Sequence, residues 1–425
     1  MSKPHILIVG AGAWGASTAV ALLQSGKYTV TLLDRAAVLP AEDAASTDIN
    51  KIVRFDYQEE VYAELAFQAL GEWRKKEWEG MYFESGTVVV APIVGKGLDL
   101  NKTIANVSRR GPVVTHSTPE EVQRALDPKD KGVTGDMTGR RGLAAELGGE
   151  VVPAAEAVEL IIGDGDVKGV RCKNGRQFKG DKVIVSAGAW TAGLLKGLLP
   201  EGLITSTGIM VAAFKLSEEE YERYKDIPVI MGFDETGFYS MPPTHDRMLK
   251  FGLDEAGYTS QTGTPRTTLT PGASEEHQKN NTSWLPRRSH DDMRVVVNMY
   301  FPEFKDRPFD FTRMCPIPAS FDDHFVLDYT KQYPSLLVAS AGKMMPIIGT
   351  LVQQRLENTL DPALTALWAI RQPTAAADEF THSKATGKVD IEDVVFAGEG
   401  EVPQVKGSAI LGKIEGAVEV VAVTA

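Results

Sequence analysis

The chain has 425 residues, of which 43% are hydrophobic and 24% charged, a composition ordinary for a globular protein that buries a large core. A formal net charge of −12 argues against a nucleic-acid partner, because phosphate binding needs clustered Lys and Arg. No stretch approaches the ~20 consecutive apolar residues that cross a bilayer. We therefore expect no membrane partner. With no signal peptide and no peroxisomal tripeptide recognisable, we expect a cytoplasmic protein.

Two cysteines, Cys172 and Cys315, are too few for a disulfide scaffold and point to a reducing compartment. No spacing of Cys and His suggests zinc, so no metal is expected.

The N-terminus carries the pattern of a dinucleotide-binding unit. An apolar run at residues 6–9 is followed by a glycine-rich turn, a helical pattern at 16–23 and a second apolar run at 30–33 that ends in an acid. The turn and the residues after the second run are Gly10, Ala11, Gly12, Ala13, Trp14, Gly15, Asp34 and Arg35.

The residues of this turn have different expected tasks. Gly10 allows the sharp turn, Gly12 lets the backbone approach a pyrophosphate, and Gly15 lets the helix pack against the strand. Asp34 is expected to accept hydrogen bonds from the adenosine ribose, and Arg35 to contact the same end of the cofactor. The pattern leaves NAD, NADP and FAD open.

The elements after this unit follow in chain order. A polar loop is predicted at residues 41–57, a helix with one buried face at 60–78, a strand at 83–92 and a helix at 120–125. A hairpin at 167–186 then feeds a buried strand that stops at small residues.

Short strands dominate the middle of the chain and predict an antiparallel sheet. Strand patterns occur at 208–214 and 238–241, with a charged helix at 217–224 between them. Residues 260–294 are rich in Thr, Pro, Asn, Ser and charge and are predicted to form a long mobile loop, with structure resuming at 293–300.

The last clear unit is a buried strand at 336–340, followed by Gly342 and an apolar helix that ends at Leu356. This pattern is expected where the chain returns to the cofactor-binding sheet and adds a further strand to it. The predicted fold class is α/β, with a Rossmann-like cofactor domain and an α+β substrate domain built on a largely antiparallel sheet.

Four segments are informative when they are taken together: residues 48–57, 186–190, 306–328 and 360–368. Jointly they resemble the fungal amadoriases, or fructosyl amino acid oxidases, within the sarcosine-oxidase group of FAD amine oxidases in the D-amino acid oxidase superfamily. The resemblance covers most of the chain, and the joint occurrence is more specific than any one segment. The domain division that we predict assigns FAD binding to residues 1–85, 150–203 and 310–425, and the substrate to residues 86–149 and 204–309.

The resemblance implies FAD as the cofactor and assigns its contacts. Besides the N-terminal turn, these are Asn50, Lys51, Arg54, Val152, Ala187, Gly188, Trp190, Cys315, Gly342, Lys343 and Met344. In the family, the cysteine that matches Cys315 forms a thioether to the flavin, whereas the alternative is a small buried apolar side chain. Cys172 has no such context and is expected to be structural.

Three further residues are implied to act on oxygen or substrate. Lys250 matches a family lysine that lies over the flavin and activates oxygen; a fixed ammonium stabilises the negative charge of developing superoxide. The alternative is an exposed strand lysine. Asp254 falls where the family has a substrate-binding glutamate. Lys388 falls where the family has a carboxylate-binding arginine, and a lysine offers a point charge in place of a bidentate clamp.

The chain departs from the family after residue 340. The family has a Ser-Gly-His-Gly-Phe-Lys run there, whereas this chain continues with Ala341, Gly342, Lys343, Met344, Met345 and Pro346 and lacks the histidine. The residues after Cys315 also differ. These changes affect the expected substrate more than the fold or the cofactor.

The resemblance implies a monomeric oxidase that converts a secondary or N-substituted amine to an imine and reduces oxygen to hydrogen peroxide. The small-molecule amine is amino-acid-derived, a fructosyl amino acid or a specialised metabolite. Two alternatives stay open: an FAD dehydrogenase or demethylase that uses little oxygen, and a flavin-binding homologue without catalysis.

Overall fold

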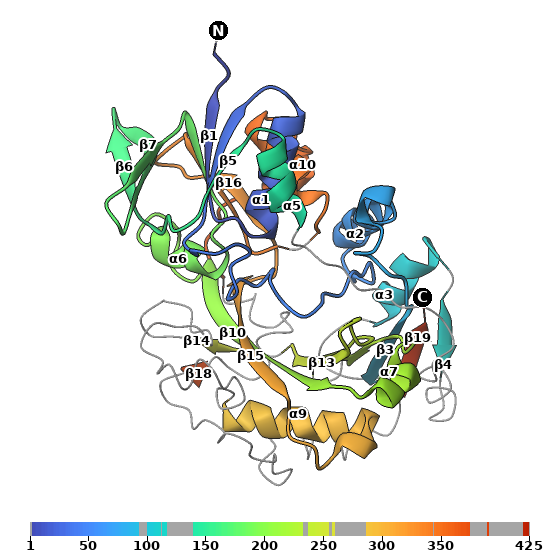
Figure 1. The fold of residues 1–425 in the computed structure, drawn as a ribbon. Coiled ribbons are helices and arrows are strands. Elements are labelled where there is room, and N and C mark those ends of the chain that lie inside the picture. Colours follow the sequence, from blue (N-terminus) through green and yellow to red (C-terminus); the bar gives the residue numbers. More distant parts are fainter. Residues whose placement is uncertain are drawn as a thin grey trace.

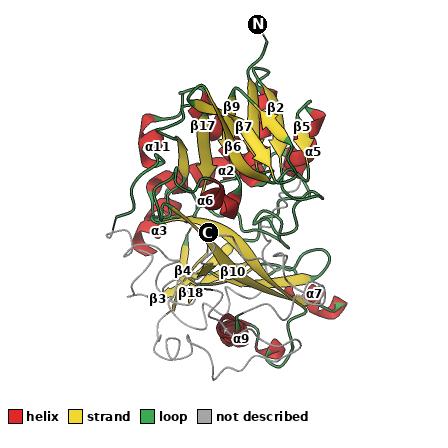
Figure 2. Ribbon diagram, turned by 90° about the vertical axis from the view of Figure 1, so that its left-hand side faces the viewer, coloured by secondary structure: helices red, strands yellow, loops and turns green. Residues whose placement is uncertain are grey.

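The computed structural model describes residues 2–92, 100–111, 113–116, 139–232, 237–254, 257–259, 286–342, 344–374, 389–390 and 420–424. These residues form two large sheets, one mostly parallel and one mostly antiparallel. Figure 1 shows the parallel sheet with its helices in the upper half and the antiparallel sheet, with α9 (Arg287–Tyr300) beneath it, in the lower half. Figure 2 shows the same two layers after a 90° turn. No helix in these ranges is long and apolar enough to cross a membrane.

The parallel sheet contains the N-terminal nucleotide unit and has the strand order β16-β17-β9-β1-β2-β5. β16 runs antiparallel to β17, and the other neighbours are parallel. The strands are β1 (His5–Val9), β2 (Thr29–Leu33), β5 (Glu150–Val152), β9 (Lys182–Val185), β16 (Val326–Tyr329) and β17 (Leu336–Ser340). Both faces of β1 are covered, which explains its continuous apolar run.

Helices cover one face of the parallel sheet, and a small sheet covers the other. α1 (Ala13–Gln24) packs against α5 (Gly139–Glu146) and α10 (Ile348–Leu356) on the first face. The small sheet packs on the second face and includes the buried Cys172. Its strands are β6 (Ala157–Gly163), β7 (Asp166–Cys172) and β8 (Gln177–Lys179).

The antiparallel sheet has the order β18-β14-β10-β13-β12-β11-β3-β19-β4, with β15 paired to β10. Its strands are β3 (Thr87–Pro92), β4 (Val114–His116), β10 (Ile204–Lys215), β11 (Val229–Gly232), β12 (Phe238–Ser240), β13 (Met248–Leu253), β14 (Tyr258–Thr259), β15 (Phe311–Ser320), β18 (Val389–Asp390) and β19 (Val420–Thr424). The long strand β10 pairs with β13 and β14 along one edge and with β15 along the other.

The face of this sheet that α9 covers is closed by aromatic and aliphatic side chains. Phe214 and Phe251 pack with Val296 of α9 in one buried cluster. The remaining helical segments are α2 (Glu60–Trp73), α3 (Leu100–Ser108), α6 (Thr191–Leu194), α7 (Glu218–Tyr224) and α11 (Pro362–Leu367), with short 3-10 helices at Lys76–Trp78, Gly188–Trp190 and Pro302–Phe304. The opposite face of the sheet is left for the cavity described below.

The predicted fold class is confirmed, because a Rossmann-like parallel sheet is joined to a largely antiparallel one. The helix predicted at 60–78 ends at Trp73 before a short 3-10 turn, and the strand predicted at 83–92 begins at Thr87. The predicted helix at 120–125 lies outside the described residues. The domain division stays a prediction; β15, β18 and β19, from the last part of the chain, pair within the antiparallel sheet.

The prediction of a loop over 260–294 is wrong at its end, because α9 begins at Arg287. The first turns of α9 carry Ser289, Asp291 and Asp292, whose polarity suggested a surface segment. All three are buried in the structure. Burial of polar side chains depends on the partners that the fold supplies, which a composition-based reading does not detect.

Candidate active site

One cavity of about 1360 Å³ lies between the two large sheets. One wall is formed at the carboxyl ends of β1, β2, β9 and β17, where open α/β sheets bind their ligands. The other wall is the face of the antiparallel sheet that α9 does not cover. Pockets for drug-sized ligands measure about 300–1,000 Å³. The cavity therefore has room for a large cofactor together with a small substrate.

The three glycines of the turn after β1 have different surroundings. Gly10 has a φ of +104°, and a Cβ there would lie 2.4 Å from the carbonyl oxygen of Ser186. A Cβ on Gly15 would lie 1.8 Å from the carbonyl oxygen of Gly10. A Cβ on Gly12 would meet only Ser46 Oγ, at 3.7 Å, so space is open beside the N-terminus of α1. A phosphate group in such a space is stabilised by the helix dipole and by the backbone N–H groups of the first helical turn.

Asp34 and Arg35 line the cavity at the end of β2. Asp34 accepts a hydrogen bond from the backbone N–H of Ala11 at 2.8 Å, which ties the end of β2 to the glycine turn. The guanidinium of Arg35 lies 4.0 Å from the ring centre of Trp190 and forms an ion pair with Asp43. An arginine stacked on an aromatic ring presents a flat polar edge to a ligand.

The loop at 41–57 crosses from the parallel sheet to the antiparallel sheet, and four hydrogen bonds fix it. Arg313 of β15 donates hydrogen bonds to the backbone oxygens of Ala44 and Thr47. Asn50 Nδ2 donates to the carbonyl oxygen of Pro242 at 3.3 Å, and Lys250 Nζ donates to the carbonyl oxygen of Asn50 at 2.9 Å. The loop is therefore held against the second wall of the cavity.

Lys250 and Asp48 form a buried ion pair in that wall. Lys250 Nζ lies 2.6 Å from Asp48 Oδ2, and both side chains are 2% exposed. Lys51 forms a second ion pair with Asp48. Burial lowers the pKa of Lys250 to about 8, although Asp48 acts to raise it. Burial would raise the pKa of Asp48, but Lys250 and Lys51 outweigh it and hold that pKa well below its usual range.

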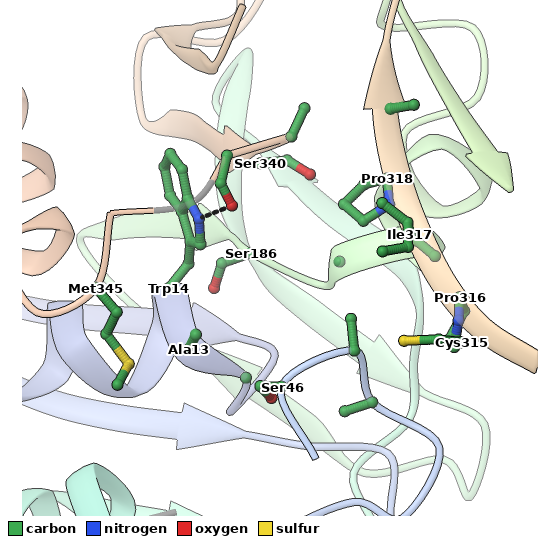
Figure 3. A pocket seen from close by; sticks show the side chains of 18 of the residues that line it. Ala13, Trp14, Ser46, Ser186, Cys315, Pro316, Ile317, Pro318, Ser340 and Met345 are labelled. Atoms are coloured by element: carbon green, nitrogen blue, oxygen red, sulfur yellow. Dashed lines mark hydrogen bonds between the residues drawn. The ribbon is translucent and has the colours of Figure 1, made fainter. Parts of the chain in front are cut away.

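Register places Cys315 and Lys250 on the same face of the antiparallel sheet. Cys315 of β15 pairs with Ile209 of β10, and Lys250 of β13 pairs with Ala213 of β10. Side chains alternate along a strand, so two positions four residues apart project to one face. Both Cys315 and Lys250 line the cavity. Figure 3 shows the sulfur of Cys315 pointing from its strand into the cavity, toward Ser46.

Tyr239 lies on this same face and covers a glycine. It pairs with Gly252, where a Cβ would lie 2.0 Å from the tyrosine ring. The ring centre lies 5.8 Å from Lys250 Nζ. Burial raises the pKa of Tyr239 well above its usual value, so its hydroxyl stays protonated and can donate a hydrogen bond.

Arg54 and Asp254 add opposite charges to the cavity lining. Arg54 Nε lies 3.0 Å from Asp56 Oδ1, and the guanidinium lies 4.5 Å from the ring centre of Tyr57. Burial acts to lower the pKa of Arg54, but Asp56, Tyr57 and Asp254 outweigh it and raise that pKa. Arg54 is therefore a permanent cation at the cavity wall.

The loop after β17 is fixed against α1. Trp14 Nε1 donates to the carbonyl oxygen of Gly342 at 2.9 Å, and a Cβ on Gly342 would lie 2.3 Å from the Trp14 ring. Figure 3 shows Trp14 with Ser340 on one side and Met345 on the other. The buried Ser340 Oγ has no hydrogen-bond partner among the described residues, although Ser340 lines the cavity. It is available to a bound group.

Tyr62 and His324 form a hydrogen-bonded pair in the cavity lining. The Tyr62 hydroxyl lies 3.0 Å from His324 Nδ1, while Trp368 Nε1 and the backbone N–H of Phe325 donate to the same oxygen at 3.1 and 3.4 Å. Because these two groups can only donate, the hydroxyl proton of Tyr62 is the one directed at Nδ1. Burial lowers the pKa of His324, which favours this neutral form.

Most of the residues predicted from the sequence are brought together here. The predicted residues that line the cavity are Gly10, Gly12, Ala13, Trp14, Asp34, Arg35, Lys51, Arg54, Ala187, Gly188, Trp190, Lys250, Asp254, Cys315, Gly342 and Met344. Four other predicted residues are buried and do not line the cavity: Ala11, Gly15, Asn50 and Val152. Lys343 and Lys388 lie outside the described residues.

Sequence reasoning missed Asp48, Tyr239 and the pair of Tyr62 with His324. Asp48 stands in a segment that the resemblance used, and a signal was available, since a buried lysine needs a buried anion. Tyr239 had no sequence signal, because its position depends on pairing with Gly252. No cluster of His, Cys, Asp or Glu suited to a metal ion occurs in the described parts of the chain.

A parallel sheet with a glycine turn, facing an antiparallel sheet across a large cavity, defines a two-layer nucleotide-dependent enzyme fold. Residues 5–355 match the family of FAD dependent oxidoreductases, and the chain belongs to that family. FAD is therefore its cofactor.

Particular relatives cover nearly the whole chain. L-saccharopine oxidase of Schizosaccharomyces pombe is 26% identical over 92% of this chain and 98% of its own. Monomeric sarcosine oxidase of a Bacillus species is 23% identical over 79% of this chain and 86% of its own. The crystal structure of Amadoriase I from Aspergillus fumigatus, a fructosyl amine:oxygen oxidoreductase, is 25% identical, has a TM-score of 0.77 and covers 94% of this chain and 99% of its own.

The cavity residues fit FAD. The open space at Gly12 suits a pyrophosphate, and Asp34 lies at the strand end where a ribose binds in this kind of unit. The unpartnered Ser340 Oγ offers a hydrogen bond further along the lining. Bound there, FAD would supply two-electron redox chemistry, and the protein supplies position and electrostatics.

Proposed function

We propose that this protein is an FAD-dependent oxidase of a secondary or N-substituted amine. The substrate gives up its C–H hydrogen together with two electrons, as a hydride equivalent, and its N–H hydrogen as a proton. The product is an imine. Dioxygen gains the two electrons and two protons and becomes hydrogen peroxide. Bound in the cavity, FAD would supply the two-electron redox chemistry that links the two half-reactions.

The observation that carries this proposal is the shared face of Lys250 and Cys315. Lys250 is buried and lines a cavity that also begins at the glycine turn. A buried ammonium stabilises the charge that develops when dioxygen becomes superoxide, and it acts most strongly where water is excluded. This supports Lys250 as the oxygen-activating residue, with Tyr239 beside it.

The polar residues of the cavity support an amino-acid-derived substrate. Arg54 is a cation suited to a carboxylate, and Asp254 is an anion suited to an amine or to hydroxyl groups. The relatives are named as oxidases of L-saccharopine, sarcosine and a fructosyl amine, which supports the amine class. In our proposal Lys343 and Lys388 add positive charge near the cofactor and the substrate carboxylate.

For the cofactor, we propose FAD contacts at the glycine turn, Asp34, Arg35, Asn50, Lys51, Arg54, Val152, Ala187, Gly188, Trp190, Gly342, Lys343 and Met344, with a thioether to Cys315. The inward-facing position of Cys315 supports the covalent bond.

Acid denaturation of the purified protein tests the proposed covalent bond. We expect yellow flavin to stay with the chain after acid denaturation, and to be released from Cys315→Ser. Cys172→Ser is the matched control, since Cys172 is equally buried but packs behind the parallel sheet. Release of flavin from the unmodified protein would contradict the covalent bond without affecting the proposed activity.

A peroxide-coupled screen over N-methyl, cyclic and fructosyl amino acids tests the activity. We expect one class to bleach the flavin under anaerobic conditions and to give peroxide in air. Anaerobic bleaching without peroxide would instead support a dehydrogenase, and yellow colour that persists with every amine would support an inactive flavin-binding protein.

A further inference from the structure

Asp48 is buried between two lysines in the wall of the cavity. We propose that Asp48 is a positioning residue that keeps Lys250 protonated and aims its ammonium group into the cavity, so that oxygen reduction depends on Asp48 as well as on Lys250. This inference rests on the proposed oxidase function.

The hydrogen bonds of Lys250 determine the orientation of its ammonium group. An ammonium group has three N–H donors. Asp48 Oδ2 accepts one at 2.6 Å, and the carbonyl oxygen of Asn50 accepts another at 2.9 Å. Within the described parts of the chain, Lys250 Nζ makes no third hydrogen bond, and Lys250 lines the cavity. The remaining N–H is thus left for a group inside the cavity.

Asp48 is itself held in place. Its Oδ1 accepts the backbone N–H of Ile49 at 2.8 Å, and its Oδ2 accepts from both lysines. The loop around it is fixed to β15 through Arg313. The carboxylate therefore connects the fixed loop to Lys250, which lies on β13, 202 residues further along the chain.

Charge balance explains why the carboxylate is needed. Lys250, Lys51 and Asp48 together carry a net charge of one when all three are ionised. Without Asp48, two cations would face each other with no counterion between them. The more buried lysine would lose its proton first, and the Lys250 side chain is 2% exposed compared with 24% for Lys51. Tyr239 and Cys315 also face Lys250; Tyr239 is neutral while its hydroxyl is protonated, and the proposed Cys315 thioether is neutral.

The consequence concerns the oxygen step. Dioxygen accepts a first electron to become superoxide, then a second electron and two protons to give hydrogen peroxide. A neutral amine at position 250 would stabilise the superoxide charge far less than an ammonium. The amine-oxidising step needs no such cation and should not depend on Asp48 in the same way.

The first test uses the flavin-loaded enzyme and measures oxidation of the pre-reduced protein by oxygen across about pH 6 to 9. For the unmodified enzyme we expect the rate to fall as pH rises through the pKa of Lys250, about 8. For Asp48→Asn we expect about a tenfold slower reaction near neutral pH and a profile displaced by about one unit or more to lower pH, with acid restoring part of the rate.

Thr47→Val is the matched control, because it changes the neighbouring residue of the same loop without changing charge. Thr47 Oγ1 is buried and makes no hydrogen bond within the described residues, and the backbone oxygen that Arg313 contacts is retained. We expect its pH profile to follow that of the unmodified enzyme. A slower Asp48→Asn enzyme with an unmoved pH profile would show a merely structural effect and overturn the inference.

A second test does not depend on activity. Urea unfolding of Asp48→Asn, Lys250→Met and the double variant forms a double-mutant cycle. If the two side chains act as a pair, the double variant loses less stability than the sum of the single losses, because neither charge is left buried alone. Strictly additive losses would overturn the pairing.

The two tests separate this inference from the proposed function. If Lys250→Met reacts with oxygen at the unmodified rate, the assignment of Lys250 in the proposed function fails, and the proposed role of Asp48 in oxygen reduction fails with it. If Lys250→Met is slow while Asp48→Asn keeps the unmodified profile, the inference about Asp48 fails alone.

Discussion

At the scale of single residues, the glycines of the N-terminal turn have different surroundings although they share one motif. Gly15 packs on the backbone of Gly10, whereas Gly12 faces open space beside the start of α1. Gly15 is therefore required by the fold itself. In our proposal Gly12 is required by the cofactor, which would approach the backbone there.

We therefore expect Gly12→Ala and Gly15→Ala to behave differently. Gly12→Ala should leave the unfolding free energy of the apoprotein within about 0.5 kcal/mol while weakening FAD binding about tenfold or more. Gly15→Ala should destabilise the apoprotein by about 1–3 kcal/mol or more through overpacking. Urea unfolding measures the stability and FAD titration measures the binding, both in the Cys315→Ser background, where FAD cannot form the proposed thioether. A large loss of apoprotein stability in Gly12→Ala would contradict this assignment.

At the scale of elements, α1 and α10 pack tightly although they are far apart in sequence. Gly349 makes this possible, because a Cβ there would lie 2.1 Å from the carbonyl oxygen of Ser17 on α1. Their contact supports the glycine turn at the start of α1 and the strand β17 that precedes α10. Capping within a single helix is simpler: Ser217 and Glu220 exchange hydrogen bonds at the start of α7.

Two glycine-to-alanine substitutions in helices test this packing. Alanine has the higher helix propensity by about 0.8–1 kcal/mol, so a glycine without close neighbours should gain stability when replaced. Gly71 of α2 has nothing within 4 Å of its Cβ position, and we expect Gly71→Ala to raise the unfolding free energy by up to that amount. Gly349→Ala should lower it by about 1–3 kcal/mol. Equal gains in both variants would refute close packing of α1 on α10.

At the scale of the whole molecule, the cavity is bounded by both large sheets. A cofactor that extends from the glycine turn to Cys315 would contact both layers. Ligand binding stabilises every part of the protein that must be folded for the ligand to bind. The two sheets should therefore respond to FAD as one unit.

The stability that FAD adds can be measured on the apoprotein of Cys315→Ser, in which FAD cannot form the proposed thioether. At a free FAD concentration of 100 Kd, we expect about 2.7 kcal/mol of added stability, seen as a single unfolding transition at higher temperature. NAD serves as the control and should give no shift. Two transitions of which FAD moves one would show that the cofactor stabilises one sheet independently of the other.

The sequence by itself determined the features that local patterns encode. The strand, glycine turn and helix from residue 5 onward, the acid at Asp34 and the buried strand β17 were all predictable, because burial on both faces and sharp turns restrict the residues that fit. The resemblance to one oxidase family added FAD, which the family match supports.

Only the tertiary structure decided which side chains meet in the cavity. Asp48 reaches Lys250 across 202 residues and Trp14 reaches Gly342 across 328, while Tyr239 covers Gly252 through strand register. The burial of the polar residues at the start of α9 was likewise decided by the tertiary structure. Such contacts depend on how distant elements pack, and the burial and charge of a polar group are set by those partners rather than by its sequence neighbours.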